Sequence, residues 1–147
     1  MPAKDLHHIA IKTHDVDATV SFYTDLMGAH TVDRPPFDFP GAWLQFGGTM
    51  VHLYGGWAAE NKDGAVDRGG AAIDHIALLA SDFDGMRDTI QRAGLEWREN
   101  DIPTANLWQL FVHDPNGVLV ELNFPIDQEA EGADGPDPER QYRAGEF

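Results

Sequence analysis

The chain has 147 residues, of which 42% are hydrophobic, so it is large enough to form one compact core or two small modules that share one. It has no cysteine, which excludes disulfide and thiol chemistry, and its formal net charge of −15 disfavours binding to nucleic acid or to anionic lipid. The sequence shows neither an apolar stretch of membrane-spanning length nor a signal peptide, so we expect a cytoplasmic protein without a membrane partner.

Residues 4–56 are predicted to form a strand, a helix and three further strands. Asp15 or Asp17 is placed to cap the helix, and Gly28 to end it in a left-handed conformation. Prolines between residues 34 and 40 indicate a loop, because proline interrupts the hydrogen bonds of a sheet. The predicted strands are residues 8–11, 31–32, 42–46 and 50–54.

The rest of the chain divides into a linker, a second module and a tail. Residues 57–71 are polar and rich in glycine, as expected of a linker. Residues 72–125 predict a second module, with a helix that starts at Asp82 or Asp84 and ends at Gly94. Its predicted strands are residues 75–78, 96–97, 108–113 and 118–124. The acidic residues 126–147 predict a tail that is mobile or contacts a partner.

The two modules resemble each other at a fixed offset. The segments His8-Ile9-Ala10-Ile11 and His75-Ile76-Ala77-Leu78 lie 67 positions apart, and so do the aspartates that follow them. Such self-similarity indicates one supersecondary unit used twice. We therefore predict an α+β protein built from two βαβββ modules.

The alternation of side chains along strands selects four candidate metal ligands. His8 and His75 lie opposite the aliphatic side chains of their strands, and His52 and Glu121 do the same near the end of each module. Three imidazoles and one carboxylate suit one divalent ion of Fe, Ni, Co, Zn or Mn. A lone histidine on a strand is usually structural, but four donors at repeat-equivalent places favour a metal site.

The remaining histidines lack this symmetry, and we interpret them as structural or surface residues: His7, His14, His30 and His113. Apolar and aromatic side chains near the predicted ligands would suit an organic small-molecule substrate. The candidate substrate-binding residues are Trp43, Tyr54, Trp57, Trp108, Gln109 and Phe111.

Four segments together resemble the vicinal oxygen chelate superfamily, which includes glyoxalase I, extradiol dioxygenases and bleomycin-resistance proteins. They are LHHIAIKTHDVDATVSFYTDLMG, GGTMVHLYGGW, DHIALLASDFDGMRDTIQRAG and FVHDPNGVLVELNF, and they span residues 6–124. The resemblance implies that the two modules form an open, curved mixed-sheet barrel around the metal. It also implies a homodimer, with the metal site either within one chain or shared between two.

The resemblance leaves three functions open. The first is glyoxalase-, epimerase- or lyase-like proton transfer, with Glu121 as the catalytic base and His52 assisting it. The second is ring cleavage by an extradiol-type Fe(II) dioxygenase, which His8, His75 and Glu121 would match, although the tyrosine usual ten residues before the glutamate is Phe111 here. The third is a drug-sequestering protein of the bleomycin-resistance type, which the four intact ligand positions disfavour.

Overall fold

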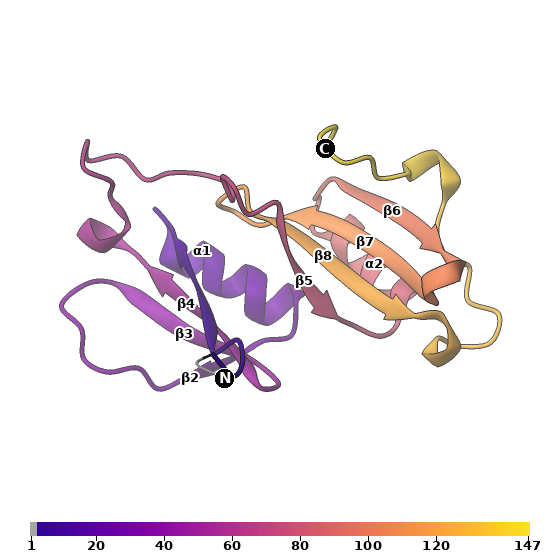
Figure 1. Ribbon diagram of the computed structural model, residues 1–147, viewed down its shortest axis with the longest axis horizontal. Coiled ribbons are helices and arrows are strands. Elements are labelled where there is room, and N and C mark those ends of the chain that lie inside the picture. Colours follow the sequence, from indigo (N-terminus) through magenta and orange to yellow (C-terminus); the bar gives the residue numbers. More distant parts are fainter. Residues whose placement is uncertain (1–2) are drawn as a thin grey trace. The chain divides into compact units, whose positions relative to one another are not determined.

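A computed structural model of the protein describes residues 3–147 and divides it into two compact units, Met1–Gly69 and Gly70–Phe147. The division falls inside the segment 57–71 that the sequence predicts as a linker. Within residues 3–147, eight strands form two four-stranded sheets, one in each unit (Figure 1). None of the helices in residues 3–147 combines the length and the apolar character that crossing a bilayer requires.

The first unit is a βαβββ module. Its elements are β1 (His8–Lys12), α1 (Val16–Ser21), a π-helical turn (Phe22–Leu26), β2 (His30–Val32), β3 (Gly41–Phe46) and β4 (Thr49–Tyr54). The strand order is β1-β4-β3-β2, with β1 parallel to β4. Asp15 caps α1 by accepting a hydrogen bond from the backbone N–H of Ala18 at 2.9 Å, and Gly28 has φ +80° after the last turn.

The second unit repeats this topology with β5 (His75–Leu79), α2 (Phe83–Arg92), β6 (Trp97–Ile102), β7 (Leu107–His113) and β8 (Leu119–Pro125). The strand order is β5-β8-β7-β6, and β5 is parallel to β8. Asp82 caps α2 by accepting a hydrogen bond from Gly85 N–H. Phe83, Ile90 and Phe124 are fully buried between α2 and one face of the sheet.

Both units confirm the predicted α+β class and the two βαβββ modules. Strand β6 is longer than the two residues predicted, because Trp97 and Glu99 alternate inward along a sequence that otherwise looks polar. The first helix is shorter than predicted, since its second half continues as the π-helical turn. The open barrel around a metal stays a prediction.

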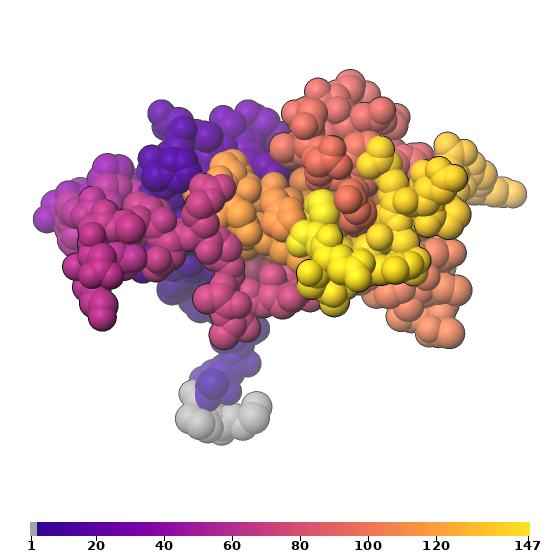
Figure 2. Space-filling model, turned by 90° about the horizontal axis from the view of Figure 1, so that it is seen from above, coloured from indigo at the N-terminus to yellow at the C-terminus, as the bar shows by residue number. Residues whose placement is uncertain are grey.

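Residues 126–147 pack against the second unit and contain two short 3₁₀ turns, at Ile126–Gln128 and Pro138–Arg140. The Glu129 carboxylate accepts hydrogen bonds from the backbone N–H groups of Asp82 and Phe83, at 3.1 and 2.8 Å, and so satisfies the start of α2. Figure 2 shows the last residues, in yellow, lying over the surface of this unit. Contact of the tail with a partner stays a prediction.

Glu99 anchors the part of the tail that begins at Asp137. It is 1% exposed, and its carboxylate accepts hydrogen bonds from the Trp97 indole at 2.8 Å and from the backbone N–H of Asp137 at 2.6 Å. The Glu99 carbonyl also accepts a bond from Tyr142 N–H at 3.0 Å, and Gln141 bridges to Glu99 in parallel orientation. The tail therefore forms one bridge to the edge strand β6.

The variant Glu99→Ala is expected to lower the free energy of unfolding by about 2 kcal/mol, because two donors lose a charged acceptor. It is also expected to speed amide exchange at Asp137 and Tyr142. Urea unfolding and hydrogen exchange would measure both effects. The control is Asp101→Ala, an exposed carboxylate on the same strand, for which we expect a change within about 0.5 kcal/mol. Equal effects of the two variants would contradict the anchoring role.

Candidate functional site

The first unit brings His8 and His52 together on one face of its sheet. The parallel register of β1 and β4 pairs Ala10 with His52, so the small alanine leaves room beside the larger ring. The two imidazoles stack with centroids 4.0 Å apart and planes at 15°. Trp43 covers the other side of His52, with centroids 4.2 Å apart and planes at 4°. His52 is thus held between two rings, while His8 remains exposed.

The Nε2 atom of His52 is buried and has no hydrogen-bond partner among residues 3–147. Buried polar atoms in folded proteins nearly always have a partner, so this nitrogen has an unused donor or acceptor site. Burial, followed by the nearby His8 and His7, lowers the pKa of His52 below its ordinary value of 6.5. The imidazole is therefore neutral at neutral pH, which is the form that binds metals.

The lowered pKa of His52 predicts a pH-dependent stability of the metal-free protein. As pH falls below 6.5, the unfolded chain takes up a proton at this residue before the folded protein does, so the free energy of unfolding falls. The effect ends below the lowered pKa of the folded state, where both forms are protonated. Urea unfolding with a chelator at about pH 7.5 and about pH 5.5 would measure it.

The variant His52→Phe is expected to show a smaller loss of stability between these pH values, because it lacks the titrating ring. His30→Gln removes an exposed histidine and is the matched control, expected to keep the wild-type slope. A His52→Phe slope equal to that of the wild type would contradict the assignment.

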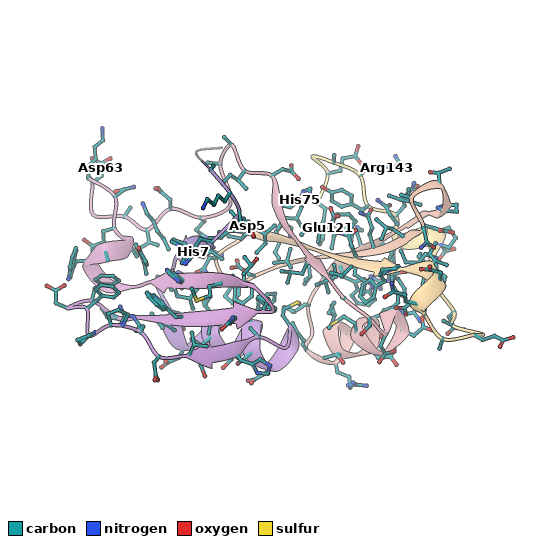
Figure 3. All side chains as sticks on the ribbon, turned by 60° about the horizontal axis from the view of Figure 1, so that its bottom comes forward. Asp5, His7, Asp63, His75, Glu121 and Arg143 are labelled. Carbon is teal, nitrogen blue, oxygen red and sulfur yellow. The ribbon has the colours of Figure 1, made fainter. Side chains whose placement is uncertain are left out.

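The second unit brings His75 and Glu121 together in the equivalent place (Figure 3). His75 Nε2 lies 3.0 Å from Glu121 Oε2. The register of β5 and β8 pairs Ala77 with Glu121, as the register of the first unit pairs Ala10 with His52. Each module therefore presents one donor from its first strand and one from its last. In both modules the first donor lies two residues before the alanine that pairs with the second donor.

Neighbouring polar groups orient this second pair. Asp74 Oδ1 lies 2.7 Å from Nδ1 of His75. Glu121 Oε1 accepts hydrogen bonds from Gln109 Nε2 and Asn123 Nδ2, both at 2.8 Å. Such outer partners fix the tautomer and orientation of metal ligands. Asp74 and Asn123 were missed in the sequence, although Asn123 follows Glu121 by two positions and so had to share its face.

The chemistry of both pairs fits a divalent metal. When Nδ1 of His75 donates to Asp74, the lone pair of Nε2 faces the Glu121 carboxylate. This contact is favourable only if a proton or a metal ion lies between the two groups. His52 offers the partnerless nitrogen. Within residues 3–147, neither unit alone groups three His, Asp or Glu side chains as a metal site. That His8, His52, His75 and Glu121 bind one common ion stays a prediction.

The aromatic residues predicted as substrate-binding in the first unit form one cluster. Trp43 and Tyr54 lie on the His52 face of the sheet. Phe39, from the loop after β2, contacts Tyr54 and Trp57 with centroids 5.2 and 5.5 Å apart, and Phe37 contacts Trp43 at 6.4 Å. Trp57 is 61% exposed. The cluster offers an apolar surface beside His52.

In the second unit, Gln109 and Phe111 lie on the Glu121 face, since Phe111 pairs directly with Glu121 across β7 and β8. Trp108 lies on the opposite face, where its ring packs against Phe83 with centroids 5.4 Å apart. Trp108 therefore does not share the face of Glu121, because consecutive residues of one strand point to opposite faces, and its role in substrate binding stays a prediction.

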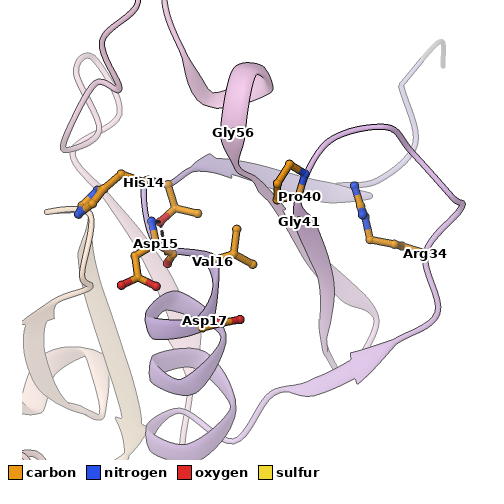
Figure 4. A pocket seen from close by; sticks show the side chains of 9 residues that line it. His14, Asp15, Val16, Asp17, Arg34, Pro40, Gly41 and Gly56 are labelled. Atoms are coloured by element: carbon orange, nitrogen blue, oxygen red, sulfur yellow. Dashed lines mark hydrogen bonds between the residues drawn. The ribbon is translucent and has the colours of Figure 1, made fainter.

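Two surface hollows lie away from the predicted ligands. One, of about 520 Å³, lies in the first unit near the start of α1, next to His14, Asp15 and Arg34 (Figure 4). The other, of about 500 Å³, lies between the start of α2 and the tail, near Asp82 and Glu129. None of the four predicted metal ligands lines either hollow.

A duplicated βαβββ chain with one donor pair per module matches the vicinal oxygen chelate class predicted from the sequence. The chain belongs to the Glyoxalase/Bleomycin resistance protein/Dioxygenase superfamily, whose family model matches residues 5–122.

The sequence is similar at low identity to two relatives. The chain is 25% identical over 122 residues to Glyoxylase I 4 of Arabidopsis thaliana, covering 80% of this chain and 68% of the relative. It is 26% identical over 124 residues to a probable lactoylglutathione lyase of Vibrio parahaemolyticus, covering 78% and 86%. The crystal structure of a lactoylglutathione lyase from Agrobacterium tumefaciens matches with a TM-score of 0.63 at 21% identity, over 84% of this chain and 96% of that one, which shows the fold.

Proposed function

We propose that this protein is a divalent-metal-dependent enzyme of the glyoxalase I-like lyase or isomerase type. His8, His52, His75 and Glu121 would bind one ion, and the substrate would be a small organic molecule with two neighbouring oxygens. The observation that carries the proposal is the matched register of the two donor pairs, Ala10 with His52 and Ala77 with Glu121. The names of the relatives support the lyase class.

The bound ion would stabilise the negative charge that develops on the substrate oxygens. Glu121 is the base that takes a proton from the carbon next to the carbonyl group. Gln109 and Asn123 both donate to its Oε1, so Oε2, which faces His75 Nε2 at 3.0 Å, is the atom that would receive the proton. Asp74 keeps the Nδ1 proton of His75 in place and leaves Nε2 to bind.

His52 would assist as a neutral imidazole. Its stacking between His8 and Trp43 restricts rotation of the ring, and its low pKa keeps the lone pair of Nε2 available. The aromatic cluster beside it would contact the organic part of the substrate. The dimeric state and the cytoplasmic location stay predictions.

An extradiol-type Fe(II) dioxygenase is the second candidate. The observation in its favour is the donor set, because His8, His75 and Glu121 are two imidazoles and one carboxylate, a set used by non-haem iron oxygenases. His52 would then be the acid–base residue. Phe111 in place of the usual tyrosine weakens this alternative.

The test has two parts, elemental analysis of the purified protein and proton exchange on a probe. The probe is lactoylglutathione, which has a hydroxyl next to a thioester carbonyl. Loaded with Ni, Co or Zn, the enzyme is expected to exchange the hydrogen between these groups for deuterium in heavy water, as followed by NMR. Iron with oxygen uptake on catechols would instead support the dioxygenase. Protein that binds no divalent metal would contradict both and favour sequestration.

A further inference from the structure

The last eleven residues, 137–147, form a strap along the outer side of β6. Its backbone is held by Glu99, which accepts from Asp137 N–H and Tyr142 N–H. Side chains anchor it on both sides of Tyr142. The Arg140 guanidinium lies 3.6 Å from the centroid of the Trp97 ring, and the Phe147 ring lies 4.6 Å from that of His113. The strap therefore has anchors that do not involve the Tyr142 ring.

The Tyr142 ring stacks on Phe111, with centroids 3.7 Å apart and planes at 8°. Phe111 is the cross-strand partner of Glu121, and directly paired residues of neighbouring strands point to the same face. The strap thus brings Tyr142 to the sheet face that carries His75 and Glu121, and not to the buried face beneath α2. The side chain stays partly exposed there.

The charges near the Tyr142 hydroxyl agree with this position. Burial raises the pKa of Tyr142, and the negative charges of Asp74 and Glu121 raise it further. These are the two carboxylates on either side of His75. The phenol is therefore neutral at neutral pH and has a proton to donate.

We infer that Tyr142 is a substrate-contacting residue that the strap delivers to the Glu121 side of the site. Its hydroxyl donates a hydrogen bond to an oxygen of the substrate, and its ring, backed by the buried Phe111, forms the apolar wall beside the reacting carbon. The inference rests on the proposed function, in that the substrate oxygens are bound next to His75 and Glu121. Tyr142 would make the proposed enzyme specific for oxygenated substrates that carry an apolar group next to the Tyr142 ring.

The experiment uses the full chain loaded with Co(II) and acetohydroxamate, a probe that binds metals through two neighbouring oxygens. Binding is read from the visible bands of the cobalt. The variant Tyr142→Phe is expected to bind the probe about tenfold more weakly, as for the loss of one hydrogen bond. Tyr142→Ala is expected to bind it more weakly still, because the apolar wall is also lost. Cobalt affinity is expected to stay unchanged in both variants.

Arg143→Ala, an exposed neighbour on the same strap, is the matched control and is expected to bind the probe within twofold of the wild type. Amide exchange at Asp137 and Tyr142 checks that the strap remains docked in each variant. Cobalt-loaded Tyr142 variants that bind the probe as the wild type does would overturn the inference and leave the proposed function standing. Wild-type protein that takes up no cobalt would overturn the proposed function, and the inference with it.

Discussion

The variant His75→Ala is expected to lose tight binding of a divalent metal and to keep its fold. His75 is the imidazole of the second donor pair, with Nε2 3.0 Å from Glu121, and removal of a direct ligand should exceed the 10–100-fold loss of affinity typical of outer-shell partners. Its side chain is 34% exposed, so the truncation leaves no large cavity. Elemental analysis and circular dichroism would measure metal content and fold.

His113→Ala is the matched control for this result. His113 lies in the same unit, on β7, and its ring packs on Phe147 outside the donor pair. We expect this variant to retain the metal content of the wild type. If His75→Ala kept its full metal content, the assignment of the second pair as ligands would be refuted.

Glu121→Gln is expected to slow deuterium exchange on lactoylglutathione by about 10²- to 10⁴-fold, the usual contribution of a positioned general base. The amide has the shape of the carboxylate, so Gln109 and Asn123 still find an oxygen to donate to. It lacks the basic oxygen that receives the proton. The exchange rate at saturating metal would be followed by NMR, so that weaker metal binding does not enter the comparison.

Glu96→Gln removes a carboxylate whose side chain is 84% exposed and is the control, expected to leave the exchange rate within twofold. A Glu121→Gln enzyme as fast as the wild type would show that another group takes the proton, and would remove Glu121 from the catalytic role.

Local signals explain why much of the fold was predictable. The repeat and the alternation of side chains identified both modules, and Asp15 and Asp82 cap their helices because a carboxylate before a helix satisfies free N–H groups. The alternation also predicted that His8 and His52 lie opposite the aliphatic side chains of their strands, as His75 and Glu121 do in the second module. By the same rule, the consecutive residues Trp108 and Gln109 cannot both lie on the face that carries Glu121.

Contacts between distant parts of the chain were not predictable. Tyr142 follows Phe111 by 31 positions, and no periodicity links the acidic tail to one ring on β7. The tail composition suggested mobility, whereas the hydrogen bonds to Glu99 depend on a buried carboxylate in a strand that looked too polar to be long. Such pairings become visible only when the backbone of the whole unit is known.

Ala10 and Ala77 are small residues, and each leaves room for the larger side chain that pairs with it on the neighbouring strand. Ala10 pairs with His52 in the first sheet, and Ala77 pairs with Glu121 in the second. His52 and Glu121 therefore occupy equivalent positions in the two modules. In the proposed metal centre, exchanging an imidazole for a carboxylate at this position would alter the net charge by one unit. A duplicated scaffold of this kind can evolve a new metal preference or a new reaction through a single side chain in either half.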